Sequence, residues 1–468
     1  MVQHIDMAPK EYIDNYIPDV NVTYKEIISL YLKDNNPWII GYSGGKDSTA
    51  ALQLIYYAIS QIEKKNRKKQ IYVLCSDTLV ENPPIIQYIR NALDKIEQSA
   101  KASDLPISVV RVEPKIEKSF WVSLIGKGYP SPNRWFRWCT DALKIEPSNR
   151  FILEKVSQFG EVIIVLGVRR SESATRAQSL KLHQIEGSTL RRHTSLPNAF
   201  VYAPIEYWST NAVWSYLLQA PSPWGGDNRA LFTLYRNAQA GECPLVIDTY
   251  TPSCGNSRFG CWTCTVVEKD HSMSGFIETG YEQLAPMLEM RNWLAEIRNE
   301  KEKRSYKRRT GGEGLGPFTL GTRREILTRL LDVQKKVGME LIQPREIELI
   351  HQIWTQEGDW QGGVSSIVQE LDMAHLGPKS LSNERGMFGQ EEDVILQKLC
   401  DAHGVPHDLV KRMLQIEREA TGLARRRGIY DRLVKALDET WMTREEVVAL
   451  REAQALENTN APEETDAK

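Results

Sequence analysis

The residue types best suited to chemistry in this sequence form a glycine-rich turn, Ser43-Gly-Gly-Lys-Asp-Ser-Thr49. The apolar run 38–42 precedes the turn and predicts a buried strand, while the Ala-, Leu- and Ile-rich run 50–59 follows it and predicts a helix. Backbone N–H groups at the start of a helix point toward bound anions, and the helix dipole favours negative charge there. Two glycines let a phosphate approach the backbone, and Lys46 adds a positive charge. The predicted nucleotide-binding residues are Ser43, Gly44, Gly45, Lys46, Asp47, Ser48 and Thr49.

The turn differs from a Walker A loop, which has a glycine six positions before its lysine and a Ser or Thr after it. Ile40 and Asp47 occupy those two places here. An acidic residue beside phosphates suits a role in holding Mg2+. The run from Ser43 to Ser48 resembles the PP-loop of the ATP pyrophosphatase superfamily. That resemblance implies cleavage of the α–β bond of ATP, with Lys46 and Asp47 as catalytic residues; the alternative is an ordinary glycine-rich turn before a helix.

Alternating strands and helices would position this turn. Further strands are predicted at 71–75, 107–112 and 162–168, and helices at 22–32 and 83–99. This order predicts an α/β fold in which a parallel sheet carries helices on both faces. It is similar to the fold of the adenine nucleotide α-hydrolases. Ligands of such sheets bind beyond the carboxyl ends of the strands, so residues that follow each strand are candidates for the site.

Two such ends carry further candidate ligands. Asp77 follows the strand 71–75 and could contact the ribose, the adenine or Mg2+, or instead cap a helix. The strand 162–168 leads into a second predicted anion-binding group formed by Gly167, Arg169, Arg170 and Arg176. A surface ion-pair cluster with Glu172 is the alternative. The segment resembles the Gly-x-Arg…Glu-Ser…Arg segment of phosphoadenosine-phosphosulfate reductase relatives.

Basic and aromatic residues gather in the segment 132–147. Arg137 and Lys144 are seven positions apart and would share a face of a helix, so with the neighbouring rings they suit a nucleotide or an anionic substrate. Together with Cys139 they are further predicted catalytic residues. An aromatic core segment with basic groups reaching the surface is the alternative. Cys139 lies among these residues and, if exposed, should have a lowered pKa. It could carry sulfur as a persulfide, or it could ligate a cluster in place of Cys243.

Four cysteines fall close together with the spacing C-x10-C-x6-C-x2-C, namely Cys243, Cys254, Cys261 and Cys264. Prolines and glycines between them predict a loop that can wrap a metal centre. Four thiolates can hold zinc or an iron–sulfur cluster. Zinc ribbons usually have two close cysteine pairs and this segment has one, so the spacing favours a [4Fe–4S] cluster held by these four residues.

The bulk composition limits the remaining choices. The chain has 468 residues, 41% hydrophobic and 26% charged, which is typical of globular proteins. The formal net charge is −2, so nucleic-acid contacts must use a local basic surface. Seven cysteines without a secretory signal indicate a reducing cytoplasm. The sequence has no apolar run long enough to cross a bilayer, and we expect no membrane partner.

These patterns divide the chain into five predicted regions. They are an N-terminal arm (1–21), a PP-loop ATP pyrophosphatase domain (22–220), a cysteine-rich cluster-binding region (221–290), a helical C-terminal region (291–456) with a basic loop (301–324), and a disordered acidic tail (457–468). The basic loop could follow a phosphate backbone or could be a solvated linker.

Several segments taken together resemble the DndC family of DNA sulfur-modification (phosphorothioation) proteins over roughly residues 22–290. They are 43–49, 137–147, 167–176, 221–228 and 254–264. That family is implicated in replacing a non-bridging oxygen of a DNA phosphate with sulfur. The resemblance implies an ATP pyrophosphatase with an iron–sulfur cluster that acts on DNA, with a cysteine desulfurase as sulfur donor and other DNA sulfur-modification proteins as partners. A sulfonucleotide reductase, a tRNA thiolase of the same superfamily and a non-catalytic nucleic-acid scaffold are the alternatives.

Overall fold

The central element is a sheet that has six strands among the residues the structure describes, in the order β3-β2-β1-β4-β6-β5. Five strands are parallel: β1 (Trp38–Gly41), β2 (Ile71–Ser76), β3 (Ile107–Val112), β4 (Val162–Val165) and β6 (Ala199–Tyr202). The two-residue β5 (Arg191–Arg192) pairs antiparallel with β6. The predicted α/β class and the largely parallel sheet are confirmed.

The buried strand β1 lies at the centre of this sheet. All four of its residues are buried, as expected for a strand covered on both faces. Trp38 is opposite Ile71 of β2 on one side and opposite Ile163 of β4 on the other. The chain proceeds from β1 to β2 and β3 in one direction and then crosses to β4. The strand order therefore reverses between β1 and β4, which is where open parallel sheets bind their ligands.

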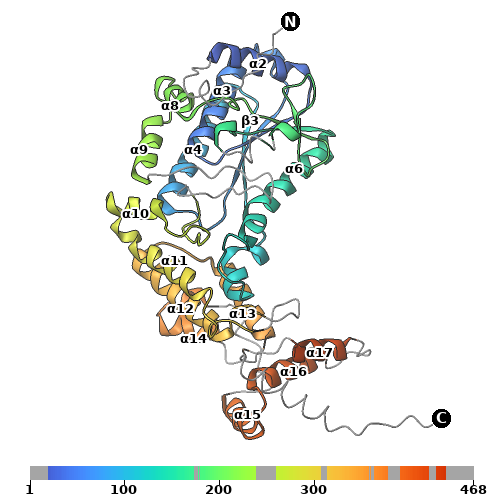
Figure 1. Cartoon of the computed structure of the whole chain (residues 1–468), viewed down its shortest axis with the longest axis vertical. Helices are drawn as coiled ribbons and strands as arrows, with labels where there is room; N and C mark the ends of the chain where they lie inside the picture. Colours follow the sequence, from blue (N-terminus) through green and yellow to red (C-terminus); the bar gives the residue numbers. More distant parts are fainter. Residues whose placement is uncertain are drawn as a thin grey trace, which may run out of the picture. The chain divides into compact units, whose positions relative to one another are not determined.

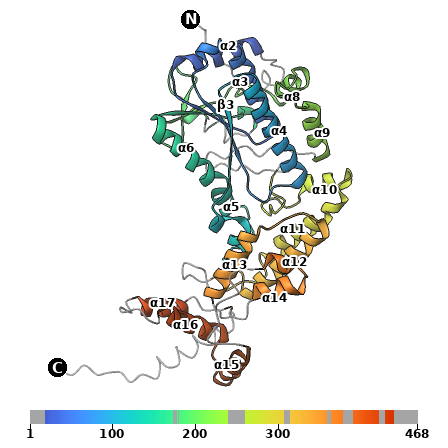
Figure 2. The ribbon, with the colours of Figure 1, turned by 180° about the vertical axis from the view of Figure 1, so that it is seen from behind.

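Helices cover both faces of the sheet. The helix α6 (Glu146–Phe159) lies on one face, where Phe151 and Ile152 pack with Ile39 and Ile164. The helices α3 (Lys46–Ser60) and α4 (Pro83–Ala102) lie on the opposite face (Figures 1 and 2). The remaining helices of this part are α2 (Val20–Lys33), α5 (Trp138–Thr140), α8 (Thr210–Gln219), α9 (Asn228–Ala238) and α10 (His271–Glu278).

The computed structural model describes residues 19–172, 178, 180–238, 260–306, 314–357, 359, 363–377, 390–420 and 428–438. The chain divides into two units, the first formed by Met1–Phe120 and Pro132–Leu288, the second by Trp121–Ser131 and Glu289–Lys468. No helix in the described ranges is long and apolar enough to cross a bilayer.

The second unit is helical and takes in residues 121–131, a segment that the sequence assigns to the nucleotide-binding domain. Two buried indoles hold that segment, because Trp121 Nε1 donates to the Leu341 carbonyl at 2.7 Å and Trp354 Nε1 donates to the Ile125 carbonyl at 3.0 Å. The helices of this unit are α12 (Leu320–Val337), α13 (Pro344–Gln356), α14 (Gly363–Glu370), α15 (Gln390–His403), α16 (His407–Ala420) and α17 (Ile429–Asp438), and α11 (Ala285–Ile297) leads into it.

Part of the predicted basic loop 301–324 is folded into this unit. Arg323 is buried in the first turn of α12 and donates to the Gly126 carbonyl at 2.7 Å. Arg304 donates to the carbonyls of Arg298 and Gly316, at 2.5 Å each. These two guanidinium groups therefore act as hydrogen-bond donors to backbone carbonyls within the second unit. Residues 307–313 of the loop lie outside the described residues.

Candidate nucleotide and thiol site

The predicted phosphate loop lies at the carboxyl end of β1, and α3 begins at Lys46. Gly45 is the N-cap residue, and no side chain caps the helix. Gly44 has φ +74°, and a Cβ atom there would approach Ile89 Cγ1 to 2.4 Å. Only glycine accommodates that conformation and that contact. The loop is closed internally, because Ser48 Oγ accepts from the Ser43 N–H at 3.2 Å and donates to the Gly45 carbonyl at 3.0 Å.

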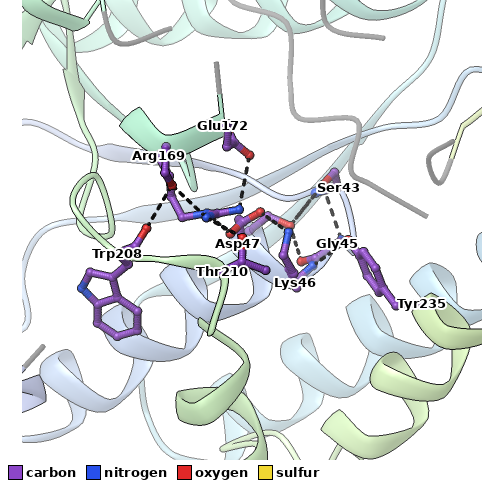
Figure 3. A network of polar contacts seen from close by, with 11 residues as sticks. Ser43, Gly45, Lys46, Asp47, Arg169, Glu172, Trp208, Thr210 and Tyr235 are labelled. Carbon is purple, nitrogen blue, oxygen red and sulfur yellow. Dashed lines mark hydrogen bonds and ion pairs between the residues drawn. The ribbon is translucent and has the colours of Figure 1, made fainter. Parts of the chain in front are cut away.

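Three buried charged side chains meet at this loop (Figure 3). Asp47 Oδ2 lies 2.8 Å from Lys46 Nζ, and Asp47 Oδ1 accepts from Arg169 Nε at 2.6 Å. Arg169 follows β4, so the two cations come from the two strands that flank the reversal of strand order. Arg169 also donates to Thr210 Oγ1 at 3.1 Å and lies 4.0 Å from Glu172. Asp47 thus holds a lysine and an arginine together at the predicted ligand-binding edge.

Tyr235 of α9 completes this group and was not expected from the sequence. Its hydroxyl accepts from the Lys46 N–H at 3.2 Å, and Lys46 Nζ lies 5.6 Å from the centre of its ring. Burial, together with the charge of Asp47, raises the pKa of Tyr235 well above its usual value, so the phenol stays neutral. An aromatic residue in an amphipathic helix carries no motif that would single it out.

The Cys-x2-Cys pair is attached to the loop that follows the neighbouring strand β2. Cys261 forms an antiparallel bridge with Glu81, and the Trp262 N–H donates to the Val80 carbonyl at 3.0 Å. The Cys264 N–H donates to the Cys261 carbonyl at 3.1 Å, which folds the pair into a turn. The thiols of this pair therefore lie at the same edge of the sheet as the phosphate loop.

Cys139 belongs to the same group of thiols. Burial, and next the charge of Cys264, raise the pKa of Cys139 to about 12, and Lys144 opposes them. The sequence predicts a lowered pKa only for an exposed thiol. In the fold Lys144 does lower the pKa of Cys139, but the loss of water around the thiol has the larger effect. The pKa of Cys261 is also well above its usual value, chiefly through burial and then Glu81, with Lys144 again lowering it. Lys144 thus acts on both thiols.

The metal ligands are only partly within reach of the structure. Cys243 and Cys254 lie outside the described residues, as does Arg176. Among the residues that are described, no three His, Cys, Asp or Glu side chains are arranged to hold a metal ion. Of the four predicted cluster ligands, the structure therefore describes two, Cys261 and Cys264.

The part of the chain that contains these residues is similar to a known protein family. Residues 37–267 match the phosphoadenosine phosphosulfate reductase domain. We call this range the reductase-like domain because of its similarity to that family. The matched range begins just before β1 and ends beyond Cys264, so the reductase-like domain spans both the phosphate loop and the described thiols.

The individual proteins that are similar to this chain have low sequence identity to it. An uncharacterized protein from Methanocaldococcus jannaschii is 28% identical over 265 residues, which are 56% of this chain and 42% of that protein. The phosphoadenylyl-sulfate reductase from Candida auris, in a phosphate complex, has 15% identity and a TM-score of 0.28 over 47% of this chain and 94% of its own. The U34-tRNA thiolase NcsA from Methanococcus maripaludis, with its [4Fe–4S] cluster, has 13% identity and a TM-score of 0.28 over 59% and 80%.

The remaining predicted ligands of the reductase-like domain have other partners. Arg170 Nε donates to Glu206 Oε1 at 2.6 Å, and its guanidinium lies 4.7 Å from the centre of the Tyr207 ring. Asp77 Oδ1 accepts from the Leu79 N–H at 2.9 Å, and its Oδ2 accepts from Arg90 at 3.1 Å. Asp77 caps no helix, because α4 has a different N-cap residue.

Two predicted catalytic residues lie in the segment that precedes α6. Arg137 is the N-cap residue of α5 and is partly exposed. Lys144 lies in the π-helical turn Asp141–Ile145 that joins α5 to α6. The Pro132 carbonyl accepts from Thr265 Oγ1 at 2.7 Å, which ties the start of this segment to the Cys-x2-Cys turn.

Gly167 is expected to be intolerant of any side chain. A Cβ atom there would lie 2.5 Å from the carbonyl carbon and oxygen of Asp47 and 2.7 Å from the Ser48 nitrogen. Gly167→Ala should therefore push the segment after β4 away from α3, weaken ATP binding measured by calorimetry, and lower the free energy of unfolding by about 1–3 kcal/mol. Gly321→Ala in α12 is the control, because no atom lies within 4 Å of its added Cβ. Unchanged ATP affinity and stability in Gly167→Ala would contradict this close approach.

Arg169 and Arg170 are expected to differ sharply although they are adjacent. Arg169→Ala removes a cation bound to Asp47 and should slow pyrophosphate release from ATP by about 100-fold. Arg170→Ala should slow it far less, because the Arg170 side chain is bound to Glu206. Pyrophosphate release by the two variants, compared at saturating ATP, measures the difference. Equal losses would indicate that both arginines bind the anion, as the sequence predicts.

Proposed function

We propose that this chain is an ATP pyrophosphatase that adenylates a DNA backbone phosphate, so that sulfur can replace a non-bridging oxygen. The observation that carries the proposal is the pair of cations, Lys46 and Arg169, held by Asp47 where the strand order reverses. Parallel sheets bind nucleotides at this position. The thiols attached to β2 lie at the same edge, so activation of the phosphate and supply of sulfur would share one site.

The loop would bind the departing pyrophosphate. The N–H groups at the start of α3 and Lys46 Nζ would hold the β- and γ-phosphates. An oxygen of the DNA phosphate attacks the α-phosphorus of ATP, and the bond from that phosphorus to the bridging oxygen of pyrophosphate breaks. Arg169 would stabilise the charge that develops there, and Asp47 would keep both cations in place throughout. Hydrosulfide then attacks the DNA phosphorus, the bond from that phosphorus to the oxygen of AMP breaks, and AMP leaves. A thiol reductant supplies the two electrons that convert the persulfide sulfur of a desulfurase to hydrosulfide.

Asp47 suits positioning better than coordination of Mg2+. Each of its carboxylate oxygens already contacts a cation, Lys46 or Arg169, so a metal ion would share these oxygens with them. Mg2+ usually binds through one or two carboxylates together with substrate phosphates. We therefore assign Asp47 to orienting the cations.

Three cysteines would hold the proposed [4Fe–4S] cluster, namely Cys139, Cys261 and Cys264, with Cys243 or Cys254 as the fourth ligand. Cys139 is included because the charge of Cys264 contributes to raising its pKa. Lys144 would balance the negative charge of the thiolates, since it acts on both Cys139 and Cys261. Such a cluster would provide a metal site for sulfur, which a cysteine desulfurase would supply.

Anaerobic reconstitution tests this function. The chain would be combined with ATP, DNA, a cysteine desulfurase, cysteine, a thiol reductant and the other DNA sulfur-modification proteins. Release of AMP and pyrophosphate should accompany the appearance of phosphorothioate dinucleotides, detected by mass spectrometry of the nuclease-digested DNA. DNA binding without ATP turnover in the assembled complex would instead favour a scaffold.

Reduction of a sulfonucleotide is the second candidate, favoured by the family match itself. That reaction requires no cleavage of ATP, whereas the Lys46–Asp47–Arg169 group is suited to a departing pyrophosphate. Release of sulfite from phosphoadenosine phosphosulfate, with no release of pyrophosphate from ATP, would decide for the reductase.

A further inference from the structure

A short turn before Cys139 displays an aromatic ring to solvent. Asn133 Oδ1 accepts from the N–H groups of Trp135 and Phe136, at 2.8 and 2.9 Å. The Asn133 N–H donates back to the Phe136 carbonyl at 3.2 Å, which closes the turn. Trp135 is 94% exposed and Phe136 is 44% exposed. The turn is thus held by its own hydrogen bonds while its largest side chain contributes almost nothing to packing.

The residues around this ring indicate which kind of ligand suits it. Arg134 is exposed and Arg137 is partly exposed, so guanidinium groups flank the aromatic pair along the chain. The turn also begins next to the tie between Pro132 and Thr265, which connects it to the Cys-x2-Cys segment. Trp135 and Cys139 are four residues apart in the sequence, so their Cα atoms are separated by at most about 14 Å. A base bound at Trp135 would therefore be close to Cys139 along the chain.

We propose that Trp135 stacks on an unpaired nucleic-acid base while Arg134 contacts the adjacent phosphate. The proposal rests on the proposed function in taking DNA as the substrate, and it adds that the strand is bound with a base out of its stack. Aromatic rings bind single-stranded nucleic acid in this way because every base has a face on which to stack, and nearby cations follow the backbone. A stacked base would fix the register of the strand relative to Cys139.

Fluorescence anisotropy with the full chain, a labelled single-stranded thymidine oligonucleotide and no ATP tests this inference. Trp135→Ala should weaken binding by about 10-fold or more, and Trp135→Phe should restore most of the affinity. The slope of log affinity against log salt should be unchanged in Trp135→Ala, because stacking releases no counterions. Arg134→Ala should instead reduce that slope by about one unit.

Tyr430→Ala is the matched control, because Tyr430 is a 77% exposed aromatic residue of the second unit. Equal affinity of the wild type and Trp135→Ala would overturn the proposal. So would intact DNA binding together with lost binding of the cysteine desulfurase, which would make the turn a protein-docking surface. Anisotropy requires no catalysis, so Trp135-dependent binding without pyrophosphate release would refute only the proposed function. Pyrophosphate release with Trp135-independent binding would refute only the stacking contact.

Discussion

Replacing Lys46 with alanine is expected to slow pyrophosphate release from ATP by about 10²–10³-fold while the reductase-like domain stays folded. Lys46 is a positively charged residue of the phosphate loop, and its side chain is buried against Asp47. Removal of one preorganised charge from such a site typically slows catalysis by about 10²–10³-fold. The fold should survive because Asp47 keeps its bond to Arg169 and is not left as an unpaired buried charge.

The matched control for this experiment is Lys64→Ala. Lys64 forms an ion pair with Asp104 in which both side chains are more than 70% exposed, so its loss should leave release and stability unchanged. Lys46→Arg is informative as well, because it keeps the charge but changes the shape of the donor. Pyrophosphate release and the iron content of anaerobic protein are measured for each variant. Normal release by Lys46→Ala would remove the phosphate loop from the proposed mechanism.

The phosphate loop could be predicted from the sequence because its structure is local. The apolar strand, the two glycines and the helix that follows are contiguous, and the first turn of a helix orients its own N–H groups. The order of strands and helices predicted the parallel sheet for the same reason. Gly44 is required by a contact with Ile89, yet its role was evident from the turn alone.

The partners of the charged residues could not be predicted, because distant segments supply them. Tyr235 lies far from Lys46 in the sequence but accepts its N–H. Arg169 and Arg170 are adjacent yet bind Asp47 and Glu206, and only the tertiary fold determines which acid each one meets. The segment 121–131 likewise gives no sign in its composition that its partners are the helices of the second unit.

Cys139 shows how burial can reverse a local prediction. Arg137 and Lys144 made a lowered thiol pKa the natural expectation from the sequence. In the fold, desolvation and the neighbouring Cys264 have the larger effect and raise the pKa. A thiol of this kind is a poor free nucleophile at neutral pH, but binding to a metal would deprotonate it outright.

Replacing Cys139 with serine is therefore expected to abolish both the binding of iron and the incorporation of sulfur into DNA. If Cys139 is a ligand beside Cys261 and Cys264, the loss of its sulfur leaves the cluster incomplete, because serine keeps the volume but is a hard, poor ligand for this metal. The anaerobic protein should lose its brown colour and most of its iron, and no phosphorothioate should form. Pyrophosphate release should be less affected, because the phosphate loop keeps all of its side chains.

Three further variants determine what a loss in Cys139→Ser means. Cys264→Ser should have the same effect, since the Cys-x2-Cys spacing predicts Cys264 as a ligand. Cys243→Ser asks whether the remaining ligand comes from the earlier part of the cysteine segment. Cys400→Ser in α15 is the control, because it removes a buried thiol from the second unit and should leave iron and sulfur incorporation intact. Retained colour with lost incorporation in Cys139→Ser would make Cys139 a sulfur carrier, and full colour with full incorporation would exclude it from the mechanism.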